Sequence, residues 1–285
     1  MHNIRIIPRL DIKGPNLVKG IHLEGLRVLG RPEDFARYYY EHGADELIYQ
    51  DVVASLYERN SLHEIISRTA KEIVIPFTVG GGLKTIDDIK SVLRAGADKV
   101  SLNTAAIKDP SIIKTAANKF GSSTIVVAIE AIKKSDGKYY AFIDNGREET
   151  GLEVVCWAQR IEELGAGEIL ITSVDREGTG EGFDIELIKS VSAAVNIPVI
   201  AHGGAANLDN IKDAIIEGKA SAVAIASILH YDAMSKIDNN KVGTEEGNKT
   251  FMNSGRNFKI IQPCEIGDIK SFLKTNQISC RPLKK

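Results

Sequence analysis

An internal duplication constrains this sequence more than any other feature. The segment Ile75-Pro-Phe-Thr-Val-Gly-Gly-Gly82 aligns with Ile197-Pro-Val-Ile-Ala-His-Gly-Gly204 at a shift of 122 residues (198 − 76 = 122). The same shift holds without a gap for seven further identities: Glu41 with Glu163, Gly43 with Gly165, Ala44 with Ala166, Glu46 with Glu168, Asp87 with Asp209, Ile89 with Ile211 and Gly96 with Gly218. The chain is therefore predicted to consist of two fused halves, each too short to bury its own core.

Short β-branched runs alternate with segments of helical periodicity up to about residue 230, which is typical of βα units around a parallel sheet. Eight strands are expected, over 4–11, 46–51, 74–79, 98–103, 124–130, 168–173, 197–202 and 221–226. Seven helices are expected between them, over 31–42, 60–71, 85–95, 109–119, 152–164, 184–194 and 208–217. Such a series could form an open sheet or a closed barrel, and the duplication favours the barrel.

We therefore predict an α/β fold, a (β/α)8 TIM barrel built from two duplicated (βα)4 half-barrels over 1–120 and 121–230. All 285 residues would form one domain, with a polar insertion over about 232–259 and a final helix over about 266–275. A net charge of −2 and dispersed basic residues argue against nucleic-acid binding. No apolar run suits a signal peptide or a membrane span, so a cytoplasmic protein is expected. The three cysteines lack metal-ligand spacing, and neither a metal nor a cofactor is expected.

Two glycine-rich strand ends indicate anion binding, because glycine allows close backbone approach and a following helix N-terminus favours negative charge. In barrels of this class the site lies at the carboxyl ends of the strands. One predicted phosphate site in each half would combine these glycines with the next strand end: Gly81, Gly82, Asn103 and Thr104 in the first half, and Gly203, Gly204, Ala226 and Ser227 in the second. The alternative, glycines needed only for tight turns, explains one such site more easily than a symmetric pair.

Two carboxylates occupy the ends of the equivalent first strands of the halves, Asp11 and Glu130. A carboxylate at the end of an apolar strand is costly to desolvate, so it is usually paired or catalytic. Two of them across one barrel mouth could act as acid and base on opposite faces of a substrate. A purely structural carboxylate remains the alternative for each residue alone.

Further polar residues at the mouth are candidates for substrate binding. The sixth strand carries Thr172 and runs on into a polar loop with Glu177 and Gly178. Lys19, expected in a loop after the first strand, would be a mobile clamp or simply a solvated lysine. At the opposite end of the barrel, four charged residues fall near strand starts, and they would form either a plug against water or a gate to a passage: Arg5, Glu46, Lys99 and Glu168.

These residues resemble those of a known family, the cyclase subunit of imidazole glycerol phosphate synthase. The resemblance covers nearly all of 1–230 and the last helix. The segments that carry it are Arg5-Ile-Ile-Pro8, Leu17-Val-Lys-Gly20, Thr78-Val-Gly-Gly-Gly82, Arg94-Ala-Gly-Ala-Asp-Lys-Val100 and Asp175-Arg-Glu-Gly-Thr179. A hairpin expected over 138–144 after the fifth strand also resembles this cyclase rather than the related isomerase.

The resemblance implies a lyase of histidine biosynthesis. Ammonia from a partner glutaminase, bound one to one, would cross the barrel and react with the bis-phosphate N′-phosphoribulosyl-formimino-AICAR-phosphate, giving imidazole glycerol phosphate and AICAR. By the same resemblance, Asp11 and Glu130 would be the general acid and base. The four charged residues at the strand starts would guard ammonia entry, and Asp98 would lie at the glutaminase interface.

The sequence departs from the family pattern near the mouth. Glu130 stands where the family has aspartate, Arg9 where a cysteine is usual, His202 in place of a serine, and Glu177 in place of an aspartate. These departures resemble a divergent branch that delivers ammonia to a sugar amidotransferase for acetamidino groups of surface polysaccharides, which is a second hypothesis. A non-catalytic binding subunit is the third.

Overall fold

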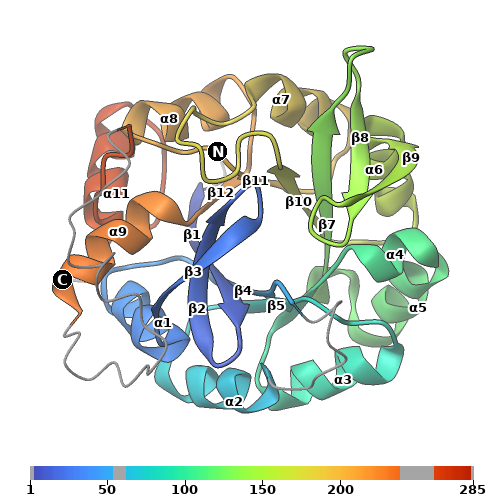
Figure 1. Cartoon of the computed structure of the whole chain (residues 1–285), viewed down its shortest axis with the longest axis horizontal. Helices are drawn as coiled ribbons and strands as arrows, with labels where there is room; N and C mark the ends of the chain where they lie inside the picture. The colour runs from blue at the N-terminus through green and yellow to red at the C-terminus, as the bar shows by residue number, and fades with distance from the viewer. Residues whose placement is uncertain (1–2, 54–61, 238–259, 284–285) are drawn as a thin grey trace.

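The computed structural model describes residues 3–53, 62–237 and 260–283, and it confirms the predicted barrel. Eight parallel strands form a sheet that closes on itself where β10 pairs with β7, and helices surround it (Figure 1). The barrel strands are β1 (Arg5–Lys13), β4 (Leu47–Asp51), β5 (Phe77–Gly80), β6 (Lys99–Leu102), β7 (Ile125–Lys133), β10 (Glu168–Ser173), β11 (Val199–His202) and β12 (Ala222–Ile225). The strands thus fall within one or two residues of most predicted bounds.

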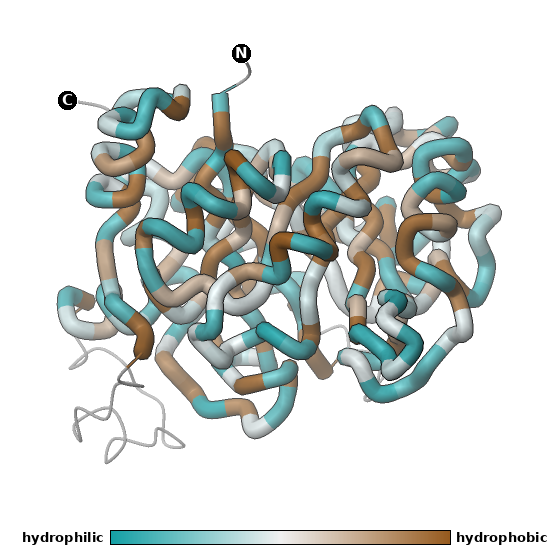
Figure 2. The backbone as a smooth tube through the Cα atoms, turned by 90° about the horizontal axis from the view of Figure 1, so that it is seen from above, coloured by the Kyte–Doolittle hydropathy of each residue, from teal (hydrophilic) through white to brown (hydrophobic). Residues whose placement is uncertain are grey.

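The helices lie outside the barrel and present their apolar stripes to it. They are α1 (Pro32–Glu41), α2 (Leu62–Glu72), α3 (Ile86–Ala95), α4 (Thr104–Lys108), α5 (Ser111–Phe120), α6 (Val154–Glu163), α7 (Ile185–Ala194), α8 (Leu208–Ile216), α9 (Ser227–Lys236) and α11 (Ile266–Thr275). Local signals fix their ends: Thr85 and Asp88 form a capping box at the start of α3, and Gly96 ends that helix with φ of 119°. Figure 2 shows brown apolar segments alternating with teal polar ones along these helices.

The hydrogen-bond register repeats the sequence duplication. Gln50 of β4 lies opposite Gly80 of β5, and Thr172 of β10 lies opposite His202 of β11, so both members of the second pair follow by 122 residues (172 − 50 and 202 − 80). Asp11 of β1 faces Gln50, while Glu130 of β7 faces Thr172. Asp11 and Glu130 consequently occupy equivalent positions.

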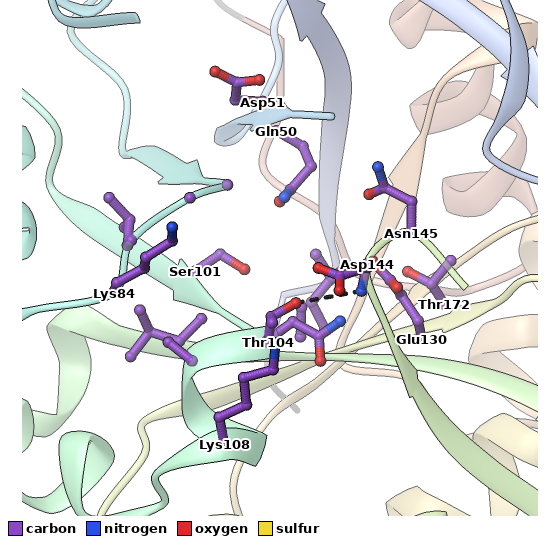
Figure 3. Close-up of a pocket in the computed structure, with 18 of the residues that line it drawn as sticks. Gln50, Asp51, Lys84, Ser101, Thr104, Lys108, Glu130, Asp144, Asn145 and Thr172 are labelled. Carbon is purple, nitrogen blue, oxygen red and sulfur yellow. Dashed lines mark hydrogen bonds between the residues drawn. The ribbon is translucent and has the colours of Figure 1, made fainter. Parts of the chain in front are cut away.

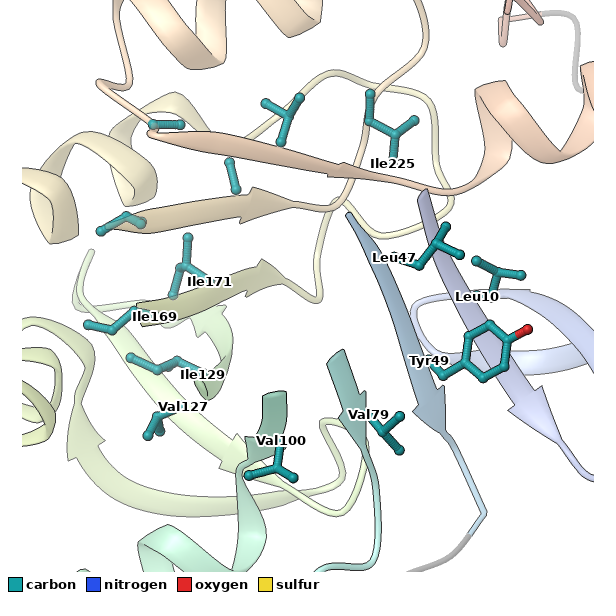
Figure 4. Close-up of a cluster of buried hydrophobic side chains, with 14 of the residues drawn as sticks. Leu10, Leu47, Tyr49, Val79, Val100, Val127, Ile129, Ile169, Ile171 and Ile225 are labelled. Carbon is teal, nitrogen blue, oxygen red and sulfur yellow. The ribbon is translucent and has the colours of Figure 1, made fainter. Parts of the chain in front are cut away.

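Side chains alternate between two cores along each strand. Outward residues such as Leu10, Leu47 and Ile171 pack between the sheet and the helices (Figure 4). Inside the barrel lies a smaller apolar layer, which we call the inner layer: Ile7, Ile48, Val126, Leu170, Ile200, Ala222 and Ala224, with Ala128 packed against it. Along β1, Ile7 belongs to this layer, so the alternation places Arg5 below it and Arg9 and Asp11 above it.

The structure corrects the predicted organisation in three places. A hairpin, β2 (Asn16–Ile21) and β3 (Glu24–Gly30), follows β1 where a loop was expected. The helices α4 and α9 were not anticipated, and α9 extends to Lys236, so the insertion does not begin at Asp232. The rest of the predicted insertion, 238–259, lies outside the described residues. The hairpin expected after the fifth strand is present as β8 (Tyr139–Ile143) and β9 (Glu148–Glu153).

The final helix α11 coincides with the helix expected over 266–275, and a buried ion pair fastens it to the barrel. Lys270 Nζ donates to Asp45 Oδ1 at 2.7 Å and to the Gly43 carbonyl at 2.8 Å. The other carboxylate oxygen of Asp45 accepts from Ile6 N at 2.8 Å, and Arg281 also contacts Oδ1. Asp45 therefore links α11 to β1. Within the described residues, no helix is long and apolar enough to cross a membrane.

We expect Lys270→Met to lower the free energy of unfolding by about 3 kcal/mol, because it leaves the buried Asp45 without this charge partner. Urea unfolding followed by circular dichroism measures the change. Lys189→Met, at an exposed position of α7, is the matched control and should lie within about 0.5 kcal/mol of the wild type. Equal stability of the two variants would contradict the role assigned to the pair.

Candidate active site at the barrel mouth

A cavity at the mouth has a volume of about 430 Å³ and lies over the strand ends of the first half and the start of the second (Figure 3). It brings together six of the predicted site residues: Gly81, Gly82, Asn103, Thr104, Glu130 and Thr172. Arg9 also lines this cavity, as do Asp144 and Asn145 from the turn between β8 and β9. A volume of this size suits a small organic ligand.

The first anion site occupies one end of this cavity. Gly81 and Gly82 have φ of 102° and 69°, a left-handed conformation that glycine adopts without strain. Sequence reasoning missed two cations that line the same cavity, Lys84 and Lys108 (Figure 3). Lysines in polar or helical segments normally project into solvent, so only the folded chain reveals that these two line the cavity.

The second anion site is assembled but nearly closed. A small cavity of about 20 Å³ is lined by the four residues predicted for it, Gly203, Gly204, Ala226 and Ser227, together with Lys19, Glu177 and Gly178, which were predicted as further substrate-binding residues. Room for a single water molecule corresponds to about 10–15 Å³, so a phosphate needs a rearrangement here.

Lys19 keeps this site closed, and it does so from a strand rather than from the predicted loop. It belongs to β2 and its Nζ forms a short, buried ion pair with Glu177 Oε1. The same carboxylate accepts from Leu23 N at 3.0 Å, so Glu177 ties the β2–β3 hairpin to the loop after β10. An entering phosphate would compete with Glu177 for the Lys19 ammonium.

Glu130 faces the cavity from β7. Its Oε2 accepts from Gly146 N at 2.8 Å. Burial raises the pKa of Glu130 to about 7, and the Gly146 N–H and the charge of Arg9 limit the rise. A carboxyl group with this pKa exchanges its proton near neutral pH, as general acid–base catalysis requires.

Asp11 is not a solitary carboxylate but half of a buried ion pair. Arg9 Nε donates to Asp11 Oδ1 at 3.0 Å, and Arg9 Nη1 donates to Thr172 Oγ1 at 3.2 Å. Arg9 and Asp11 are only 4% and 3% exposed. Because a buried charge is costly without a partner, the loss of either side chain would leave the other unpaired inside the barrel.

His202 lies beside the second anion site as a neutral ring. Its Nδ1 lies 2.9 Å from the Ala224 carbonyl, which accepts, so Nδ1 carries the proton and Nε2 has a free lone pair. Burial, followed by the charge of Arg9, lowers the pKa of His202 well below its usual value. Nε2 is buried without a hydrogen-bond partner among the described residues, and it could accept from a hydroxyl group of a ligand.

The four charged residues predicted at the other end of the barrel do meet. Arg5 donates to Glu46 Oε1 at 2.8 Å and to Glu168 Oε2 at 3.0 Å, while Lys99 donates to Glu168 Oε1 at 2.7 Å and to Glu46 Oε2 at 3.2 Å. Two cations and two carboxylates thus close a neutral ring below the inner layer. Asp98, on the same end, is exposed and accepts from Phe77 N at 2.9 Å.

We expect Gly81→Ala to weaken the binding of inorganic phosphate at the first site, and Gly204→Ala to weaken it at the second. In each variant the affinity of that site should fall at least about 10-fold. A Cβ would lie 2.3 Å from the Asp51 carbonyl oxygen in the first variant and 2.2 Å from the Gly182 carbonyl oxygen in the second. Phosphate titration followed by ³¹P NMR counts the sites. Gly137→Ala is the control, because it has φ of 81° and open space around its Cβ. Two unchanged sites in the variants would contradict the assignment.

Comparison with known proteins places this geometry in a family. A sequence profile described as "Histidine biosynthesis protein" matches residues 5–235. The Legionella pneumophila imidazole glycerol phosphate synthase subunit HisF is 57% identical over 209 residues, covering 73% of this chain and 99% of the relative. The proteins of the same name from Alkaliphilus metalliredigens and Prochlorococcus marinus strain MIT 9515 are 47% and 52% identical, covering 81% and 80% of this chain and 92% and 89% of the relatives.

These relatives bear the name of the cyclase subunit, so the comparisons do not favour the second hypothesis, delivery of ammonia to a sugar-modifying enzyme. Each relative is named as a subunit, which means that it works within an assembly. With the barrel, the paired carboxylates and the two glycine-lined sites in place, the chain belongs to the family of the imidazole glycerol phosphate synthase subunit HisF.

Proposed function

We propose that this chain is the cyclase subunit of imidazole glycerol phosphate synthase, a lyase of histidine biosynthesis. The observation that carries the proposal is the equivalence of Asp11 and Glu130, which lie at matching register positions at one mouth of the barrel. Glu130 lines the same cavity as Gly81 and Gly82, and a second glycine-lined cavity lies at the same mouth. This arrangement suits a substrate with a phosphate at each end and a reacting centre between them.

The proposed reaction demands proton transfer at its centre. Ring closure around one ammonia nitrogen forms two C–N bonds, releases the amine of AICAR and eliminates water. The ammonia nitrogen must therefore lose protons while the departing nitrogen and oxygen gain them. A carboxylate on one wall and a carboxyl group with pKa about 7 on the other supply an acceptor and a donor, the roles proposed for Asp11 and Glu130.

The two phosphates would hold the substrate across the mouth. In the first site, the backbone at Gly81 and Gly82 and the side chains of Asn103 and Thr104 would contact one phosphate, with Lys84 and Lys108 supplying positive charge. In the second, Gly203, Gly204 and the start of α9 at Ser227 would bind the other, once Lys19 exchanges Glu177 for the ligand. A phosphate that binds at the second site would therefore have to offset the loss of the ion pair between Lys19 and Glu177.

Ammonia would reach the centre from a glutaminase bound one to one at the end of the barrel that carries the charged ring. Two features support this route. The ring of Arg5, Glu46, Lys99 and Glu168 lies below the inner layer, at the end of the barrel opposite the mouth. Asp98 is exposed at the same end. The ring would then be a gate rather than a plug. A phosphorylated nucleotide substrate also supports the expected cytoplasmic location.

With ammonium salt as the nitrogen source, Asp11→Asn and Glu130→Gln should each reduce kcat for imidazole glycerol phosphate formation by at least about 100-fold. Absorbance or chromatography of the AICAR product measures turnover. Glu163→Gln, an exposed carboxylate of α6, should retain wild-type activity. Wild-type turnover in both mouth variants would refute the proposed acid–base pair.

The gate proposal gives a separate expectation for Lys99→Met. Removing Lys99 leaves Glu46 and Glu168 with Arg5 as their remaining partner in the ring, so the passage should admit ammonia poorly. We expect glutamine-dependent turnover with the glutaminase to fall about 10-fold, while turnover with ammonium salt changes less than about 2-fold. Lys114→Met, exposed on α5, controls for loss of a lysine. Equal loss in both assays would indicate a structural ring.

A further inference from the structure

The function proposed above assigns no role to Arg9, a charged residue at the mouth. It projects into the barrel between the inner layer and the two carboxylates, and it lines the main cavity together with Glu130. The duplication identifies its counterpart in the second half: Arg9 pairs with Ile48, Ala128 pairs with Leu170, and Leu170 follows Ile48 by 122 residues. One half thus carries a long cation where the other carries a methyl group.

Contacts at both ends hold Arg9 in place. Its guanidinium is bound by Asp11 and Thr172, as described above. The pairing of β1 with β12 ends at Pro8 and Ile225, one residue before Arg9. The backbone carbonyl of Arg9 accepts a hydrogen bond from His230 Nε2 at 3.0 Å. His230 Nδ1 in turn accepts from Tyr39 OH at 2.6 Å, and both of these side chains are fully buried. A side chain fixed in this way cannot swing freely into solvent.

The charges around Arg9 come from several strands. Asp11 lies on its own strand β1, while Glu130 lies on β7 opposite Thr172, the residue whose hydroxyl accepts from Arg9. Asp144, in the turn between β8 and β9, contributes a negative charge near Glu130. The neutral ring of His202 lies near Arg9 on β11. Lys19 of β2 is the nearby second cation, paired with Glu177. Arg9 is therefore bonded directly to one carboxylate and only close to the other.

We infer that Arg9 is a positioning residue that divides the work of the two carboxylates: its guanidinium holds Asp11 in place as the proton acceptor and is not bonded to Glu130, the proton donor. The inference rests on the proposed function. The bond from Arg9 Nε fixes the orientation of the Asp11 carboxylate, whereas Glu130 is an unpaired carboxyl group whose pKa is raised by burial. The charge of Arg9 nevertheless keeps the pKa of Glu130 from rising further.

The test compares Arg9→Met, which removes the charge at similar length, with Arg9→Lys, which retains it. Turnover is measured with saturating bis-phosphate from pH 5.5 to about 9, with the concentration of neutral ammonia held constant. We expect the wild type to lose activity as pH rises through about 7, where Glu130 gives up its proton. In Arg9→Met, this decline should move to higher pH and kcat should fall at least about 10-fold with KM changed less than about 3-fold.

A second readout does not require turnover. ¹³C NMR of glutamate labelled at the side-chain carboxyl follows the titration of Glu130, assigned by its absence in Glu130→Gln. Its midpoint should lie near 7 in the wild type, higher in Arg9→Met, and near the wild-type value in Arg9→Lys. Arg160→Met, at an exposed arginine of α6, should change neither the midpoint nor kcat.

The two readouts separate the possible failures. An unmoved Glu130 midpoint in Arg9→Met, or wild-type kcat in that variant, would overturn the inference about Arg9. If the wild type makes no imidazole glycerol phosphate at any pH while the midpoint shifts as expected, the proposed function is wrong and the electrostatic link between Arg9 and Glu130 stands.

Discussion

Because all eight barrel strands run parallel and the sheet closes between β7 and β10, every strand presents its carboxyl end on the same face. Side chains that are distant in sequence meet there without any need for long loops. The repeated register adds a second constraint, since it places Asp11 and Glu130 at equivalent points around the ring of strands. The backbone hydrogen bonds of the barrel therefore fix which strand positions meet at the mouth, whichever side chains those positions carry.

The barrel interior then has to accommodate charge at both ends of an apolar layer. Transfer of an ionised group out of water costs several kcal/mol even after relaxation, so interior charges need partners. At one end, two cations and two carboxylates compensate one another in a closed ring. At the mouth the compensation is uneven: Arg9 pairs with Asp11, and Lys19 pairs with Glu177. Within the part of the chain that the structure describes, Glu130 forms no ion pair, and burial raises its pKa to about 7. This unevenness makes two equivalent carboxylates chemically different.

The β2–β3 hairpin links binding to the state of the second anion site. It lies over the mouth, where Lys19 and Leu23 both contact Glu177 after β10. The first site, by contrast, is open and already lined by Lys84 and Lys108. One phosphate can therefore be held by preformed groups, while the other must displace an existing ion pair. In the proposed function, occupancy of the second site would therefore be coupled to a change in the contact between Glu177 and the hairpin that carries Lys19.

The sequence by itself determined the fold class, the eight strands and the duplication, because these depend on local periodicity and on repeats at a fixed shift. From the same repeats it predicted two glycine-rich anion sites. It also indicated Asp11, Glu130 and the charged ring. It did not reveal the β2–β3 hairpin. It also did not reveal that Lys84 and Lys108 line the cavity of the first site, because the sequence around a single lysine does not indicate where its side chain points. Only the tertiary structure decided that Arg9 binds Asp11 and that Glu130 is left without such a partner. Arg9 and Asp11 lie two residues apart on β1, but the partners available to Glu130 lie on other segments of the chain, whose distances from it are set by the closing of the barrel.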